Sequence, residues 1–157
     1  MSQRLSTAGI QVGYAVETTA GTRPTAANAY KYIKEIKDIP EINPEPSQLD
    51  TTTLDETEYR TYIPGLKDLG STLGLLANFT EDFKSDWEAF VTASETAKAD
   101  GKATWLTIVI PGITEAFYMQ CQPSPLGFSG AAVDEVLENT AYITPTSAPI
   151  WAALPTA

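Results

Sequence analysis

The sequence predicts a mainly β (α+β) fold, namely an antiparallel β-sandwich or part-barrel with one flanking α-helix and a long projecting loop. Three observations lead to this prediction. Apolar residues recur at every second position in several segments, as they do in half-buried strands. One segment has helical spacing instead. A Pro-Gly turn joins two β-rich segments into a hairpin.

The N-terminal half contains three expected strands. Gln11–Val16 is a short β-rich segment. Residues 30–39 alternate between two sets of side chains, which predicts one strand whose faces lie in different surroundings. Residues 69–80 alternate again, with Leu and Ala on one side, and predict a half-buried strand.

A helix is expected directly after this strand. Thr80 is a suitable N-cap, and Gly101 lies just past the expected end. Acidic residues occupy the first turn, where the helix dipole favours them. Four apolar side chains share one stripe that is typical of a core face: Phe83, Trp87, Phe90 and Val91.

The C-terminal half is expected to form a hairpin and a last strand. Residues 103–110 and 115–122 flank Pro111-Gly112 and predict two antiparallel strands. Residues 132–144 predict a last strand that is interrupted near Asn139. The chain thus has about six or seven expected strands, and the helix would cover one edge or opening of the sheet.

A long polar excursion occupies residues 40–65. It contains several prolines, a threonine run and a cluster of acidic residues, with Tyr59, Tyr62 and Ile63 near its end. Loops of this length inside a compact domain are usually functional or flexible. We expect this loop to project and to become ordered against a partner.

The charge of the chain limits its partners and its compartment. The net charge is −10, with 20 acidic and 10 basic residues, which disfavours tight binding to nucleic acid. No segment approaches the roughly 20 apolar residues of a membrane helix, so no membrane insertion is expected. Cys121 is the one cysteine, so no internal disulfide forms, and we expect folding in a cytoplasm.

The residue types also argue against catalysis. The chain has no histidine, which removes the commonest general base and the usual zinc ligand. Paired carboxylates occur at Asp55 with Glu58 and at Glu81 with Asp82, where solvation and helix capping explain them. No metal or cofactor is expected, because the spacing of Asp50, Asp55 and Glu58 does not match a calcium-binding loop and the glycines do not form a phosphate-binding loop.

The last residues form an uncharged arm, 144–157. It follows Glu138, the last charged residue of the sequence. Its apolar residues among prolines suggest a docking surface rather than a frayed terminus: Ile150, Trp151 and Leu154.

The central sequence resembles a known family. Residues 49–70 read LDTTTLDETEYRTYIPGLKDLG, which is similar to the central region of major tail tube proteins of siphophages, the long non-contractile-tailed bacteriophages. The later runs WEAF at 87–90, GKATW at 101–105, IVIPG at 108–112 and PSPLGF at 123–128 continue the same order of parts. The resemblance covers roughly residues 49–144.

This resemblance implies a single tail tube domain over 1–157 with the phage tail tube fold. Such subunits form hexameric rings that stack into a hollow tube, through which DNA is ejected into the host. Implied partners are further copies of the chain, a tape-measure protein, a tail terminator and distal tail proteins. The implied location is the virion, after assembly in the host bacterial cytoplasm.

In the same picture, the loop bridges neighbouring subunits and rings, and the C-terminal arm docks as well. The loop residues implied to make these contacts are Leu49, Thr51, Thr52, Thr53, Leu54, Asp55, Tyr59, Tyr62, Ile63 and Pro64. The acidic excess would keep DNA from adhering to the channel wall.

Three alternatives remain at this stage. The chain could be the tube protein of a contractile tail or of a secretion-like system. It could instead be a monomeric carbohydrate-binding β-sandwich of a phage particle. A hydrolase that uses carboxylates alone is a third alternative.

Overall fold

The computed structural model of the chain describes residues 4–44, 46–68 and 72–156. Its contacts group the residues into two compact units, Glu41–Gly70 and the remainder of the chain. The sequence predicted one domain over 1–157 with a projecting loop at 40–65. The smaller unit contains nearly all of that loop and continues to residue 70.

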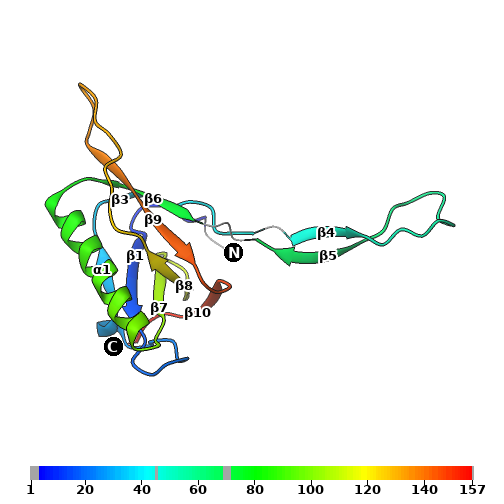
Figure 1. The fold of residues 1–157 in the computed structure, drawn as a ribbon, viewed down its shortest axis with the longest axis horizontal. Helices are drawn as coiled ribbons and strands as arrows, with labels where there is room; N and C mark the ends of the chain where they lie inside the picture. The colour runs from blue at the N-terminus through cyan, green and yellow to red at the C-terminus, as the bar shows by residue number, and fades with distance from the viewer. Residues whose placement is uncertain (1–3, 45, 69–71, 157) are drawn as a thin grey trace. The chain divides into compact units, whose positions relative to one another are not determined.

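The larger unit is built on one curled antiparallel sheet (Figure 1). In the described residues this sheet has eight strands, which are β1 (Gln11–Val16), β2 (Lys31–Ile33), β3 (Ile36–Asp38), β6 (Leu73–Asn78), β7 (Thr104–Val109), β8 (Glu115–Pro123), β9 (Glu138–Pro145) and β10 (Ile150–Ala153). Their order is β2-β1-β7-β8-β9-β6-β3, and β10 pairs with β8. The predicted mainly β fold with a part-barrel sheet and one helix is confirmed.

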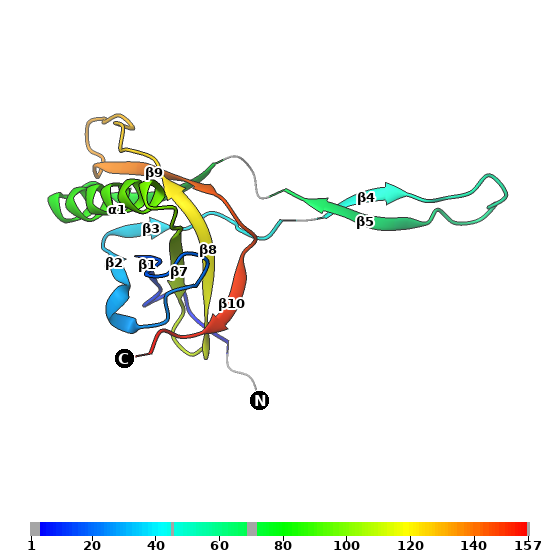
Figure 2. The same cartoon turned by 60° about the horizontal axis from the view of Figure 1, so that its bottom comes forward.

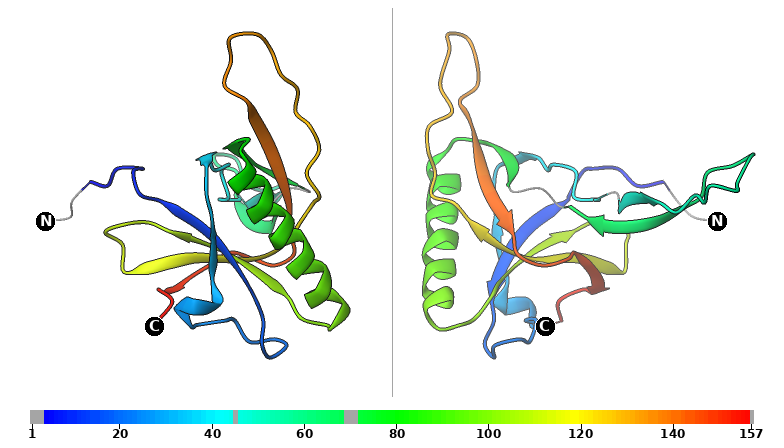
Figure 3. Two further views of the ribbon diagram at one scale, coloured as in Figure 1. Left: turned by 90° about the vertical axis from the view of Figure 1, so that its left-hand side faces the viewer. Right: turned by 45° about the vertical axis from the view of Figure 1, so that its right-hand side comes forward.

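The two edge strands of this sheet are consecutive in the sequence. β2 ends at Ile33 and β3 begins at Ile36, although they lie at opposite edges. Three residue steps span at most about 11 Å, so the edges must come together and the sheet must curl, as Figure 3 shows. The prediction of one strand over 30–39 is wrong, because Glu35 has a φ of 70° and turns the chain there.

The helix α1 (Glu81–Ala99) begins and ends as predicted. The Thr80 hydroxyl accepts a hydrogen bond from the backbone N–H of Phe83 at 3.2 Å, which caps the first turn. Gly101 follows the last turn with a φ of 72°, a conformation that favours glycine.

One face of α1 packs on the sheet (Figure 2). Phe83, Trp87 and Phe90 are fully buried, whereas Val91 is only half-buried and lies at the margin of the stripe. The Tyr14 ring of β1 stacks on Phe90 with 4.4 Å between ring centroids. Aromatic contacts therefore hold the helix against the sheet.

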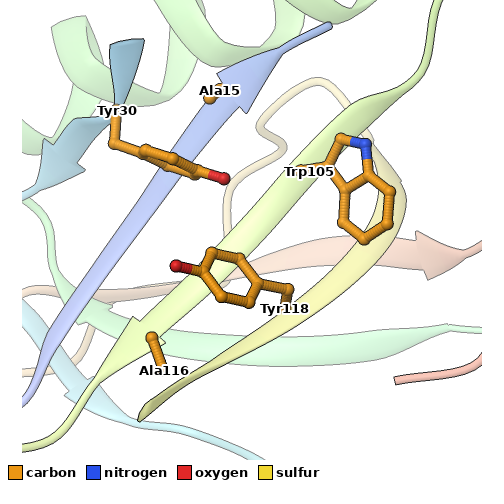
Figure 4. Packing of buried hydrophobic residues seen from close by; sticks show 5 residues of the cluster. All are labelled: Ala15, Tyr30, Trp105, Ala116 and Tyr118. Carbon is orange, nitrogen blue, oxygen red and sulfur yellow. The ribbon is translucent and has the colours of Figure 1, made fainter. Parts of the chain in front are cut away.

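A second core lies on another part of the sheet (Figure 4). Its buried members are Ala15, Tyr30, Trp105, Ala116 and Tyr118. The Tyr30 hydroxyl donates to the carbonyl of Pro24 at 2.7 Å, so the loop before β2 is tied to this cluster. Five of the six residues of β7 are buried, the largest buried share among the strands of this sheet.

The C-terminal half follows the predicted hairpin but differs beyond it. β7 and β8 pair antiparallel across the turn, as predicted. β9 begins at Glu138, so the prediction of a strand from residue 132 is wrong, and residues 132–137 belong to a loop. The strand continues through Asn139, whose buried side-chain amide donates to the carbonyl of Gly127 at 2.9 Å.

The C-terminal segment differs from the expected free arm. β10 pairs with β8 of the same chain, with Trp151 opposite Phe117. The two rings meet edge to face, 5.6 Å apart. The segment 144–157 therefore contributes a strand to its own sheet, which the sequence did not predict.

A buried carboxylate ties β1 to β7. Glu17 is 3% exposed, and it accepts hydrogen bonds from the backbone N–H of Gly21 and Ala103 and from the Trp105 indole, at 3.1, 2.9 and 3.0 Å. Burial alone would raise the pKa of Glu17, but the three donated bonds outweigh it and the pKa lies below its ordinary value. The side chain is therefore ionised in the folded protein at neutral pH.

We predict that Glu17→Gln lowers the free energy of unfolding by about 1–3 kcal/mol at pH 7. The glutamine side chain has an NH2 group in place of one carboxylate oxygen, so at least one of the N–H groups that donate to Glu17 would lose its acceptor. Because folding lowers the pKa of Glu17, its ionised carboxylate stabilises the fold at pH values above the ordinary pKa of glutamate. This contribution to stability is lost as the pH falls through the lowered pKa of the folded protein. The gap between the variant and the parent should therefore narrow in acid. Urea unfolding at pH 7 and pH 3, with the exposed Glu95→Gln as control, measures it. An equal gap at both pH values would contradict the assignment.

Candidate assembly surface

The unit Glu41–Gly70 is a β-hairpin. β4 (Pro46–Asp50) pairs antiparallel with β5 (Tyr62–Lys67), and Leu49 lies opposite Ile63. None of its described residues is buried. An isolated two-stranded ribbon is marginally stable in water, so this unit needs further contacts to be stable.

The sequence predicted a loop here and missed both strands. Pro46 and Pro64 argue against strand structure, because proline has no N–H to donate to a sheet. In a two-stranded ribbon each strand has one unpaired edge, which tolerates proline. The pairs Pro46–Lys67 and Gln48–Pro64 accordingly flank a shift in register.

Threonines close the tip of the hairpin. The backbone N–H of Thr51 donates to the carbonyl of Thr61 at 2.8 Å. The N–H of Thr61 donates back to the Thr52 hydroxyl at 2.9 Å, and the hydroxyls of Thr51 and Thr61 lie 3.0 Å apart. These bonds give residues 51–61 a defined shape although they are exposed.

Two aspartates of the tip serve the same local order. Asp50 accepts from the N–H of Thr52 at 2.9 Å and lies 3.7 Å from the Arg60 guanidinium. Asp55 accepts from the hydroxyl of Thr53. Hydrogen bonds hold the pKa of both aspartates below the ordinary value. The largest contributions come from the hydroxyl of Thr52 for Asp50 and the hydroxyl of Thr53 for Asp55.

Glu56 caps the turn at the end of the tip. One of its oxygens accepts from the backbone N–H groups of Thr57, Glu58 and Tyr59 at 3.1, 3.0 and 3.3 Å. The bond from Glu58 contributes most to a lowered pKa of Glu56. Within residues 4–44, 46–68 and 72–156, no group of three or more acidic or cysteine side chains is placed to hold a metal ion.

The hairpin exposes a set of large apolar side chains. Each member is at least half exposed, and the set is Leu49, Leu54, Tyr59, Tyr62, Ile63 and Leu66. All of them except Leu66 were expected from the sequence to make contacts; Leu66 follows the Pro-Gly pair and is 90% exposed. Surface of this kind on one small unit is typical of a binding surface.

The other predicted contact residues belong to the larger unit. Ile150 and Trp151 lie on β10 with about half of their surface exposed. Leu154 packs against the second core instead. The structure thus separates the expected C-terminal docking residues into two exposed side chains and one that stabilises the fold.

Cys121 does not provide a reactive thiol, and α1 is not a membrane-spanning helix. Cys121 is buried, and burial raises the pKa of its thiol to about 12, so the thiolate is scarce at neutral pH. The described helices include none that is both long enough and apolar enough to cross a bilayer.

Known proteins resemble this chain in structure but not in sequence. No protein-family model and no curated protein matches it. A chain of the anti-feeding prophage (AFP) baseplate, a 6-fold symmetrised cryo-EM structure, matches with a TM-score of 0.61 and 10% identity over 98% of this chain and 99% of that chain.

Two further structures are similar. A chain in the tail of an empty GTA particle with C6 symmetry matches with a TM-score of 0.57 and 12% identity, over 92% of this chain and 96% of that chain. A chain of the AFP tube terminating cap matches with a TM-score of 0.58 and 9% identity, over 98% and 93%. At such identities the similarity establishes a shared fold, one used in components of phage-tail-like particles.

We predict that Thr52→Val loosens the hairpin tip without unfolding the larger unit, because it removes the acceptor for the N–H of Thr61. Hydrogen exchange followed by NMR should show faster exchange at Thr61 and unchanged protection in β7. Thr57→Val, on the same tip, is the matched control. Unchanged exchange at Thr61 would show that the threonine network does not order the tip.

Proposed function

We propose that this chain is a structural subunit of a phage tail tube, which assembles into hexameric rings that stack into a hollow tube for DNA ejection. The observation that carries the proposal is the hairpin unit, with six large exposed apolar side chains and no buried residue among those described. The shared fold supports it, because two of the similar chains come from structures with 6-fold or C6 symmetry.

Ring assembly would also protect the edges of the sheet. Short edge strands with unpaired backbone groups invite contact with another chain, and a closed ring of copies covers them. Contacts between unlike surfaces of identical copies can close into a ring and can also repeat along an axis. In this proposal the hairpin residues Leu49, Thr51–Thr53, Leu54, Asp55, Tyr59 and 62–64 make contacts between subunits.

The sequence resemblance favours a siphophage tube. A second candidate is a tube, baseplate or cap component of an AFP-like particle, which is favoured by the similarity to chains of the AFP baseplate and the AFP tube terminating cap. Both candidates are structural and non-enzymatic. Both place the protein in an assembled particle, with the tape-measure, terminator and distal tail proteins as partners of a siphophage tube.

We predict that purified, concentrated protein forms hollow tubes or six-fold rings in negative-stain electron microscopy. A variant in which a short Gly-Ser linker replaces residues 46–67 should keep its circular dichroism spectrum for the larger unit and lose these assemblies. Tubes that extend without limit identify a tube subunit, whereas rings that stop at one layer identify a cap or baseplate component.

A strictly monomeric protein, even after a tail-tip initiator complex is added, would contradict the proposal. It would favour the alternative of a monomeric carbohydrate-binding module, which glycan-array binding would then test. Tubes formed by the variant without the hairpin would contradict the role of the hairpin in assembly, but not the proposal that the chain is a tube subunit.

A further inference from the structure

We propose that a polar pocket beside the C-terminal part of α1 binds a small neutral molecule with several hydroxyl groups, of the size of a monosaccharide. The observations behind this inference are the position of the pocket, the side chains that line it and two buried hydroxyls without a partner. The residues that line the pocket all belong to the larger unit, so the inference goes beyond the proposed assembly and does not depend on it.

The pocket lies where the sheet divides. β8 pairs with β7 through residues 117–120 and with β9 through residues 121–123. Beyond Gln120, no described strand continues the pairing on the β7 side of β8. The C-terminal part of α1 and the segment that follows β1 form the other walls of the space left there. Its volume is about 330 Å³, which is within the range of small-molecule sites.

Buried polar side chains converge on this pocket. Among the described residues, five polar or charged side chains are buried, and three of them line the pocket, namely Glu17, Ser94 and Thr104. Glu17 accepts the three hydrogen bonds given above. The hydroxyls of Ser94 and Thr104 form no hydrogen bond within the described parts of the chain, although these residues are only 5% and 4% exposed. Because a buried hydroxyl without a partner is costly, both groups favour a ligand that supplies the missing bonds.

The lining excludes two classes of ligand. No aromatic side chain and no Leu, Ile or Val is among the described residues that line the pocket, so an apolar ligand would find few contacts. A phosphate or another strong anion would meet the ionised Glu17, and Lys102 is the one cation among the lining residues. A neutral polar ligand avoids both penalties.

Hydroxyl groups of a ligand match the groups that remain. Gln120 and Gln122 lie on the same face of β8 and line the pocket, and within the described residues their carboxamides form no hydrogen bond. A carboxamide or a hydroxyl donates and accepts hydrogen bonds, as each hydroxyl of a sugar does. The affinity should be weak, with a Kd in the millimolar range, because no aromatic ring of the pocket stacks on the ligand.

Saturation-transfer difference NMR of the intact chain tests the inference, because this method detects weak ligands on a protein of any size. The probes are glucose, galactose and N-acetylglucosamine, each added separately, with glycerol as the comparison for unspecific binding of a polyol. The test variant combines Ser94→Ala with Thr104→Val and so removes both unpartnered hydroxyls. Thr92→Val, at an exposed position of α1 outside the pocket, is the matched control.

The inference predicts that at least one of the three sugars binds the parent and the control equally and binds the double variant about tenfold more weakly. Since neither hydroxyl has a partner in the described chain, the double variant should unfold at the same temperature as the parent or above it when no sugar is present. A lost signal would then report lost binding rather than lost folding.

Four results would overturn the inference. They are no signal from any of the three sugars, equal signals from the parent and the double variant, glycerol binding as strong as sugar binding, and a lower unfolding temperature of the double variant without sugar. The last result would show that the two hydroxyls already have partners in the protein. None of these results changes the outcome of the assembly experiment, so the proposed function is tested separately.

Discussion

The shortness of the link between β2 and β3 is the constraint on which the larger unit depends. Only Lys34 and Glu35 separate two strands that lie at opposite edges of one sheet. The backbone N–H of Lys34 donates to the Asp86 carboxylate of α1 at 3.2 Å, and the Glu35 carbonyl accepts from the N–H of Asn78 at 3.0 Å. The link is thus attached to the helix and to β6, and the sheet cannot flatten without breaking these bonds.

The larger unit has a buried core of its own, whereas the described residues of the hairpin include none that is buried. In the larger unit, aromatic packing under α1, the second core and the ionised Glu17 satisfy apolar and polar groups within the chain. In the hairpin, hydrogen bonds among threonines and carboxylates give shape to the tip but bury no side chain. Shape without burial provides little stability, and in the proposed assembly a neighbouring copy supplies the remaining stabilisation.

Local sequence patterns predicted β1, α1 and the β7–β8 hairpin well, because capping, periodicity and turn chemistry act over a few residues. They missed the break at Glu35, because a non-glycine residue with positive φ has no clear sequence signature. They missed β10, whose pairing with β8 depends on contacts distant in sequence. For the candidate site, the sequence identified the apolar side chains Leu54 and Tyr59 but missed the β4–β5 pairing beneath them, because a proline in each strand argues against strand structure.

The central claim is that identical copies of this chain close into rings through their hairpins. Native mass spectrometry of the assembled protein counts the chains in each particle directly. The account predicts species of six chains and multiples of six, which disappear when residues 46–67 are replaced by a short linker. A distribution of monomers and dimers alone at every concentration, or hexamers that persist without the hairpin, would contradict it.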